Sequence, residues 1–246
     1  MPAQQGGDPK TGRLEAPEVK AMFDRIAGVY DLINTLMTAG LHHRWRERAA
    51  EIAMVGPGSR VLDVAAGTGD LSIELARRVA PDGEVIGSDF SEGMLDRARI
   101  KGAKALGHSS AGLRFEWGDA LDLPYDDGSF DAATVGFGAR NFSDLARGLA
   151  EMARVVRPGG RVVVLDFTTP VRPPLSTFYS VWFDRVVPLL GRLSADPDAY
   201  EYLPNSVKRF PAPAALAAEM QSAGLDRIRY VLTAGGIVTI HVGTVR

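Results

Sequence analysis

Residues 61–70 join a hydrophobic run to a glycine-rich turn, and this junction constrains the fold more than any other part of the sequence. The segment reads Val-Leu-Asp-Val-Ala-Ala-Gly-Thr-Gly-Asp, which predicts a buried strand, a tight turn and the start of a helix. Gly67 and Gly69 can adopt backbone angles that other residues avoid, and they let a ligand approach the main chain closely. We expect the amides of this turn to face a nucleotide-like cofactor.

Strand-like runs alternate with helical patterns, which predicts an α/β fold with a mostly parallel sheet. The five expected parallel strands are residues 60–64, 84–89, 113–117, 130–135 and 161–166. Two final strands, residues 226–232 and 237–242, are separated by a four-residue segment that permits an antiparallel hairpin. Ser91 and Ser143 are expected N-caps. The expected architecture is Rossmann-like, a seven-stranded sheet with helices on both faces.

The length of 246 residues suits a single domain, which we place at residues 18–246. Residues 1–17 are polar and rich in glycine and proline, which predicts a disordered tail. Residues 18–52 are expected to form an N-terminal helical lid. Residues 169–209 contain several prolines and an aromatic segment, and we expect them to form an insertion over the substrate side.

Composition excludes several classes of function. The chain has no cysteine, which excludes disulfides and thiolate sites and is compatible with a reducing cytoplasm. Its four histidines lack the spacing of a zinc motif, so we expect no metal. The net charge of −2 gives no basic footprint for nucleic acid, which we do not expect as a partner. No apolar run reaches the ~18 residues of a membrane span, so we expect a cytoplasmic protein with at most peripheral contact at the inner face of the membrane.

Acidic residues around the glycine turn discriminate between cofactors. Asp89 ends the second expected strand about 20 residues after Gly69, where such folds place the acid that holds two ribose hydroxyls. The turn lacks the third glycine of the dinucleotide fingerprint, and Asp63 would repel a diphosphate. S-adenosylmethionine instead carries a sulfonium and an ammonium group, which a carboxylate attracts. Asp119 follows the third strand, where it could accept a hydrogen bond from an adenine amino group.

These ordered motifs resemble the class I S-adenosylmethionine-dependent methyltransferases. The expected cofactor-binding residues are Asp63, Ala65, Gly67, Thr68, Gly69, Asp89, Asp119 and Ala120. Further segments are similar to the menaquinone and ubiquinone biosynthesis C-methyltransferases, namely residues 22–34, 136–141, 202–207, 209–211 and 235–241. This resemblance covers nearly the whole chain. It implies S-adenosylmethionine as cofactor and a prenylated quinol as substrate, with demethylmenaquinol in menaquinone biosynthesis as the first choice.

The resemblance leaves alternatives open. The ring could be the 2-polyprenyl-6-methoxy-1,4-benzoquinol of ubiquinone biosynthesis, or another phenolic metabolite. A protein that binds the cofactor without catalysis, as a scaffold in a quinone-synthesis assembly, is the alternative from another class. Formation of a homodimer also stays open. The family often has serine or alanine where this chain has Gly136, and a bulkier residue at Ala139, so Gly136 is not among the expected site residues.

Methylation of a ring carbon needs an electron-rich ring, which a quinol becomes when a hydroxyl ionises to a phenolate. Arg140, which follows the fourth strand, is expected to stabilise that anion, and Asn141 to orient the same hydroxyl. The alternative is that Arg140 is a structural ion-pair partner and Asn141 an N-terminal helix residue. Further candidate substrate contacts are Tyr30, Tyr200, Tyr202 and His241. Each of these could equally be a buried packing residue with a satisfied polar tip.

Three other segments each have two interpretations. Phe23 and Tyr30 are expected either in a lid over the cofactor or in an amphipathic helix packed on the core. The aromatic part of residues 169–209 could bind an isoprenoid tail, or could be ordinary core or a dimer contact. The basic run at residues 42–48 could be a solvated face or could meet anionic lipid.

Overall fold

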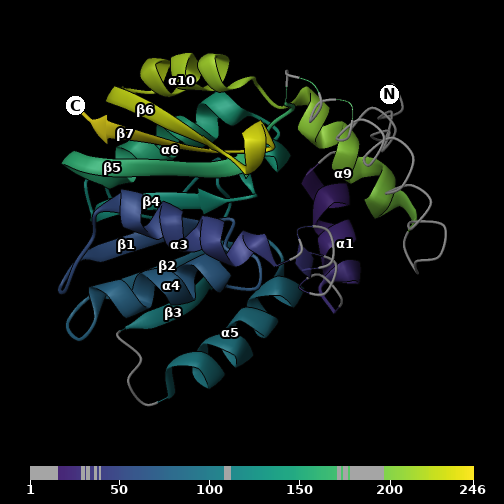
Figure 1. Ribbon diagram of the computed structural model, residues 1–246. Helices are drawn as coiled ribbons and strands as arrows, with labels where there is room; N and C mark the ends of the chain where they lie inside the picture. The colour runs from purple at the N-terminus through teal and green to yellow at the C-terminus, as the bar shows by residue number, and fades with distance from the viewer. Residues whose placement is uncertain are drawn as a thin grey trace, which may run out of the picture.

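Seven strands form one sheet in the order β3-β2-β1-β4-β5-β7-β6 in the computed structural model of the protein (Figure 1). The strands are β1 (Arg60–Val64), β2 (Glu84–Asp89), β3 (Leu113–Trp117), β4 (Phe130–Gly136), β5 (Val156–Phe167), β6 (Leu225–Thr233) and β7 (Val238–Val245). Strands β1 to β5 are parallel, whereas β7 runs antiparallel to both β5 and β6. The predicted sheet with its C-terminal hairpin is confirmed.

The structure describes residues 16–28, 40–107, 112–170 and 197–246, together with positions 31, 34, 35, 38, 173 and 177. Most of the predicted tail lies outside these residues, and so does most of the predicted insertion. Helix α9 (Pro197–Arg209) is the described end of that insertion. Helix α1 (Ala16–Ile26) is the first described part of the predicted lid.

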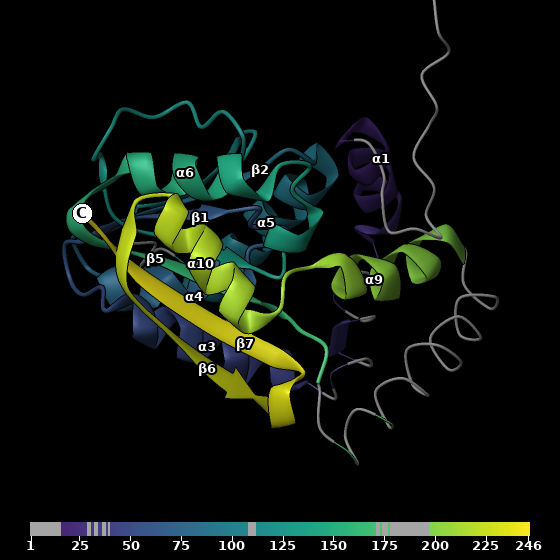
Figure 2. The same cartoon turned by 90° about the horizontal axis from the view of Figure 1, so that it is seen from above.

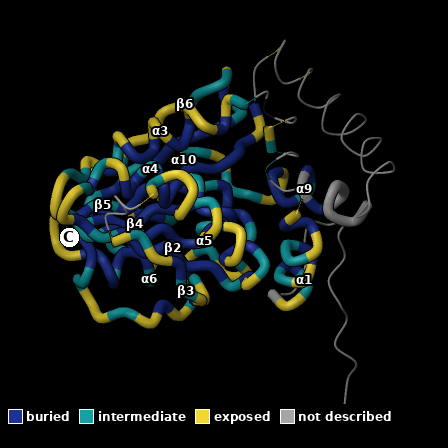
Figure 3. Tube along the Cα trace, turned by 90° about the horizontal axis from the view of Figure 1, so that it is seen from below, coloured by how far each residue is buried: buried dark blue, intermediate teal, exposed yellow. Residues whose placement is uncertain are grey.

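Helices cover both faces of the sheet (Figure 2). Those that flank the sheet are α3 (Leu41–Ala53), α4 (Asp70–Val79), α5 (Glu92–Leu106), α6 (Leu145–Val155) and α10 (Pro213–Ser222). Helices α3 and α4 share one hydrophobic cluster with Val61, whereas α6 and α10 share another with Leu62. Side chains alternate between the two faces along a strand, so neighbouring residues of β1 enter different clusters. The inner strands are buried, and the edge strands β3 and β6 include exposed residues (Figure 3).

Several element boundaries differ from the sequence-based expectation, and the start of β5 and the cap of α6 have identifiable causes. Strand β5 begins at Val156 and not at Arg161, because Val156 pairs with Phe130 before a register shift that accommodates the intervening Pro-Gly-Gly. Ser91 caps α5 as predicted, since its hydroxyl accepts a hydrogen bond from the Met94 N–H at 3.2 Å. The cap of α6 is Asp144 and not Ser143, because the Asp144 carboxylate accepts from the Arg147 N–H at 3.0 Å.

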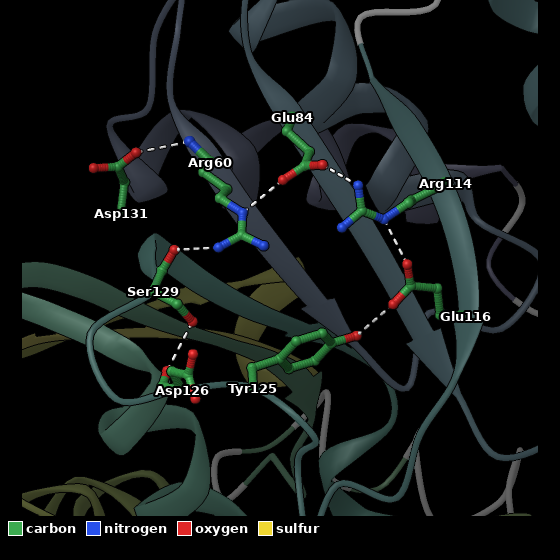
Figure 4. Close-up of polar contacts among 8 residues, drawn as sticks. All are labelled: Arg60, Glu84, Arg114, Glu116, Tyr125, Asp126, Ser129 and Asp131. Carbon is green, nitrogen blue, oxygen red and sulfur yellow. Dashed lines mark hydrogen bonds and ion pairs between the residues drawn. The ribbon is translucent and has the colours of Figure 1, made fainter.

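A chain of ion pairs crosses the first three strands near their amino ends (Figure 4). Arg60 of β1 pairs with Glu84 of β2 at 2.5 Å, and Glu84 also pairs with Arg114 of β3. The Arg60 backbone N–H donates to Asp131 of β4 at 2.7 Å. Partly exposed pairs of this kind each contribute about 0–1 kcal/mol. They lie at the amino ends of the strands, away from the edge where the predicted site residues gather.

Helices α1 and α9 lie side by side beyond the carboxyl ends of the parallel strands (Figures 1 and 2). Tyr202 of α9 packs in one hydrophobic cluster with Val19 and Met22 of α1 and with Met94 of α5. Ligands of open α/β sheets bind at this carboxyl edge. The two helices therefore flank the region in which a site is expected.

Candidate active site

A cavity lies at the carboxyl ends of β1, β2 and β4. It encloses about 1010 Å³ outside protein atoms, including space open to solvent at its mouth. The predicted residues that line it are Asp63, Ala65, Gly67, Thr68, Asp89, Asp119, Ala120 and Asn141. The structure thus brings together seven of the eight expected cofactor residues and one of the two expected catalytic residues. Phe23 of α1 also lines the cavity, on the side of the predicted lid.

Asp89 fixes the shape of the glycine turn. One carboxylate oxygen accepts the Gly67 N–H at 2.8 Å, and the other accepts the Ser91 N–H at 2.9 Å. Only 6% of Asp89 is exposed, and burial raises its pKa to about 6. The expectation that the turn amides face the ligand is wrong for three of them, because Ala66, Gly67 and Gly69 donate their N–H groups within the protein.

Asp63 is a second buried carboxylate on the cavity wall. It accepts hydrogen bonds from the hydroxyls of Ser72 at 2.6 Å and Thr134 at 2.7 Å, and is 1% exposed. Burial raises its pKa to about 6, against the opposing effect of the two hydroxyls and of Arg46. At neutral pH the cavity therefore holds two desolvated anions, Asp63 and Asp89, and it favours a cationic ligand.

The backbone beside the cavity adopts left-handed conformations at two residues other than glycine. Ala65, after β1, has φ 52°, and Phe137, after β4, has φ 62°. A side chain on Gly138 would place its Cβ 2.6 Å from the Ala65 Cβ, so the two turns touch. Residues in such conformations cost about 1–3 kcal/mol each and gather at functional sites.

Gly69 does not line the cavity with the other residues of the turn. It is the N-cap of α4 with φ 84°, and a Cβ there would lie 2.7 Å from the Phe115 ring. Gly69 lies where α4 packs closely against β3 and α5. The neighbouring Thr68 does line the cavity, and its hydroxyl donates to Asp31 at 2.6 Å.

Arg140 and Asn141 form a short 3-10 turn, η3 (Ala139–Asn141), after β4. The Arg140 guanidinium forms a buried ion pair with Asp166 at 2.7 Å and donates to the Phe137 carbonyl at 2.5 Å. Asn141 lines the cavity, and its side-chain oxygen accepts a hydrogen bond from the Tyr202 hydroxyl at 3.1 Å. Arg140 is thus the ion-pair partner that the alternative interpretation describes, and it lies behind the cavity wall.

The other candidate substrate contacts divide. Burial raises the pKa of Tyr202, which therefore stays protonated beside Asn141. His241 is not brought to the cavity, because it is buried on β7 and its Nε2 lies 2.9 Å from the Pro213 carbonyl oxygen. Tyr30 lies outside the described residues, and so does the side chain of Tyr200.

Several cavity residues were not predicted from the sequence. Phe90 follows β2 directly and Phe137 follows β4 directly, and both line the cavity. Their positions after predicted strands could have identified them as cavity residues from the sequence. Gly136 also lines the cavity. Arg46 comes from α3, before the first strand, and no local pattern connects it with the cavity.

The part of the chain that the structure describes contains no group of three or more His, Cys, Asp or Glu placed to hold a metal ion. Within the same residues, no helix is long and apolar enough to span a membrane.

Known proteins resemble this chain over nearly its whole length. The sequence profile of the ubiE/COQ5 methyltransferase family matches residues 11–245. A demethylmenaquinone methyltransferase of Thermus thermophilus is 49% identical, over 90% of this chain and 99% of its own length. One of Deinococcus radiodurans is 48% identical, over 93% and 92%. A protein of Geobacter sp. named ubiquinone/menaquinone biosynthesis C-methyltransferase UbiE is 40% identical, over 92% and 95%.

Solved structures share the fold at low sequence identity. A SAM-dependent methyltransferase from Aquifex aeolicus has a TM-score of 0.60 and 18% identity, covering 82% of this chain and 89% of its own. A SAM-dependent methyltransferase from Thermotoga maritima has a TM-score of 0.59 and 21% identity, covering 89% and 98%. These likenesses support the Rossmann-like fold.

Proposed function

The chain belongs to the ubiE/COQ5 methyltransferase family, and on that premise we propose that it transfers a methyl group from S-adenosylmethionine to a ring carbon of demethylmenaquinol. Relatives named demethylmenaquinone methyltransferase, up to 49% identical, support this choice of substrate. The observation that carries the proposal is the pair of buried carboxylates, Asp63 and Asp89, on one cavity wall. S-adenosylmethionine brings two positive charges and one negative charge to that wall.

The residues present fit this cofactor. Asp89 would hold the ribose hydroxyls and Asp63 the ammonium group. Asp119 and Ala120, which follow β3, would lie at the adenine end. Phe90 would supply an apolar contact for the adenine ring. When bound, S-adenosylmethionine supplies an electrophilic methyl group and leaves as S-adenosylhomocysteine.

The protein must favour the ionised form of the quinol, whose hydroxyl has a pKa of about 10 in water by analogy with tyrosine. We assign Asn141 as a direct contact of that hydroxyl, because its oxygen is occupied by Tyr202 and its amide nitrogen is left as a donor. The buried charge of Arg140 lies close to this pair and lowers the pKa of Tyr202 against the effect of burial. Asp166, its ion-pair partner, raises the pKa of Tyr202 and so offsets part of this effect. We therefore assign Arg140 a positioning role through the turn that it holds, with the remainder of its charge favouring a phenolate.

Product formation from reduced substrate tests the proposal. The protein is incubated with methyl-labelled S-adenosylmethionine and demethylmenaquinone, either reduced with dithionite or left oxidised. We expect labelled menaquinol in the reduced sample alone, because the quinone form has no hydroxyl to ionise. Asn141→Ala should lower turnover with reduced substrate, and Gln221→Ala, at an exposed position of α10, serves as the comparison. Absence of product from every reduced quinone tested would remove the assignment.

A second candidate substrate is 2-polyprenyl-6-methoxy-1,4-benzoquinol. The Geobacter relative, 40% identical, carries a name that joins ubiquinone and menaquinone biosynthesis. Comparing kcat/KM for the two quinols under the same reducing conditions decides between them. A non-catalytic cofactor-binding scaffold would bind labelled cofactor and yield no labelled quinol in a single-turnover assay.

Peripheral membrane contact belongs to the same proposal, because a prenylated quinol resides in a membrane. In the basic run of α3, His43, Arg44 and Arg48 are exposed, whereas Trp45 and Arg46 are buried. The exposed residues would meet anionic headgroups at the inner face of the membrane. We expect the protein to float with anionic vesicles, and we expect this binding to weaken in high salt.

The mass of the protein in solution, measured by light scattering, decides whether it forms a homodimer.

A further inference from the structure

Arg46 is a buried cation that lines the cavity, although it was not among the site residues predicted from the sequence. It lies on α3, its side chain is 9% exposed, and its guanidinium carbon is 5.4 Å from the centre of the Phe137 ring. Its Nη1 lies 3.1 Å from an Asp70 oxygen, and yet this nitrogen makes no hydrogen bond within the described residues. A buried guanidinium donor without a hydrogen-bond partner is costly, which indicates that a ligand completes it.

Arg46 shares its acidic partner with a second cation. Asp70 is shared, because Lys101 also pairs with it at 2.5 Å and with Asp31 at 2.7 Å. His42 lies four residues before Arg46, is 3% exposed, and neither ring nitrogen has a partner among the described residues. Burial lowers the pKa of His42 to about 4, so this ring is neutral at pH 7. His42 therefore adds no positive charge beside Arg46.

The order of the strands indicates which end of the bound cofactor would lie beside Arg46. Asp119 follows β3 and Asp89 ends β2, and these are the adenine and ribose positions of the proposed function. The next strands in the sheet are β1 and β4, which supply Asp63 and Phe137. Arg46 lies over Phe137, and its charge acts on Asp63. It therefore belongs to the methionine end of the cavity.

The methionine end of the cofactor carries an ammonium and a carboxylate group. Asp63 supplies the negative charge that the ammonium group needs. The Arg46 Nη1, which makes no hydrogen bond within the described residues, matches the carboxylate. Building on the proposed function, we propose that Arg46 binds the methionine carboxylate of S-adenosylmethionine and orients the amino-acid end of the cofactor.

Ligands with and without the carboxylate test this role. S-adenosylhomocysteine contains the amino-acid end, whereas 5′-methylthioadenosine lacks it and keeps the adenine and ribose. Calorimetry is run with both ligands on the wild-type protein and on Arg46→Met, Arg46→Lys and Arg48→Met. Arg48 lies on the same helix with a side chain 59% exposed, and is the matched control.

In Arg46→Met, we expect the affinity for S-adenosylhomocysteine to fall about 10- to 150-fold, the range for a hydrogen bond to a charged group. The affinity for 5′-methylthioadenosine should change less than about twofold. Arg46→Lys should retain part of the preference for the carboxylate ligand, because it keeps the charge and loses the fork of donors. Arg48→Met should match the wild type for both ligands.

Two results would overturn the assignment. Unchanged affinity for S-adenosylhomocysteine in Arg46→Met would show that the carboxylate binds elsewhere, and equal losses for both ligands would show that Arg46 only supports the fold. If Arg46→Met does not fold, the ratio of the two affinities in Arg46→Lys decides, and a ratio equal to that of the wild type counts against the role. Wild-type protein that binds neither ligand would instead refute the proposed function.

Discussion

Replacement of Asp89 probes the connection between the glycine turn and cofactor binding. In Asp89→Ala, the backbone N–H groups of Gly67 and Ser91 lose acceptors that lie at 2.8 and 2.9 Å. Each buried donor left without a partner costs about 1–3 kcal/mol, so the free energy of unfolding should fall by about 2–6 kcal/mol. Loss of a charge-assisted bond to the ribose should weaken S-adenosylmethionine binding by about 1.5–3 kcal/mol, or about 10- to 150-fold.

Asp89→Asn separates these two effects. Its amide oxygen can accept only one of the two backbone bonds, and its NH2 group faces the other N–H. The variant should therefore recover at most half of the unfolding free energy that Asp89→Ala loses. The loss of affinity should persist, because the charge is gone. Urea denaturation and calorimetry measure the two quantities, and Asp82→Ala, at an exposed acid in the turn before β2, is the control. Wild-type affinity in both Asp89 variants would refute the ribose assignment.

Three further predictions concern the charges and the backbone of the site. Arg140→Met should lower the free energy of unfolding by about 3–5 kcal/mol, because it leaves the buried Asp166 carboxylate without its ion-pair partner. It should also lower kcat more than it lowers cofactor affinity. Equal losses in the two quantities, measured by kinetics and calorimetry, would indicate a structural role alone. Burial raises the pKa of Asp63 and Asp89 to about 6. Their contribution to the stability of the empty protein is therefore greatest below the unfolded pKa, near 4, and is lost as pH rises through about 6. Binding of a cationic ligand has the opposite sign, so S-adenosylmethionine affinity should fall as pH drops from 7.5 to 5, and an affinity independent of pH would contradict the ionised state assigned to these groups. Gly138→Ala should lower both the melting temperature and cofactor affinity, whereas Gly56→Ala, where a Cβ meets nothing within 4 Å, should change neither.

The strands were predictable because each is a short apolar run between turn signals. The start of β5 was not, because Pro158 and the glycines after it have the composition of a chain break. The register shift that lets Val156 pair with Phe130 depends on β4, which is distant in sequence. The predicted cap of α6 was one residue too early, because Ser143 and Asp144 are adjacent and both residue types are good caps.

The acids at strand ends were predictable for a geometric reason, since the carboxyl ends of parallel strands meet at one edge of the sheet. Asp63, Asp89 and Asp119 all follow this rule and all reach the cavity. His241 was not predictable in the same way, because its direction depends on how β7 pairs with β5. Arg46 reaches the cavity through the packing of α3 on the sheet, and no spacing in the sequence encodes that contact.

The left-handed backbone at Ala65 and Phe137 makes the walls of the cavity preorganised. Folding supplies the free energy that holds these two turns, through the strands on either side and the contact at Gly138. A ligand therefore binds to turns that are already ordered, and its binding free energy includes little cost for ordering them. Ala65→Gly should remove the strain of the positive φ and also give the empty turn more backbone freedom. Slower association and a more unfavourable entropy of binding would be the calorimetric and kinetic signs of that freedom.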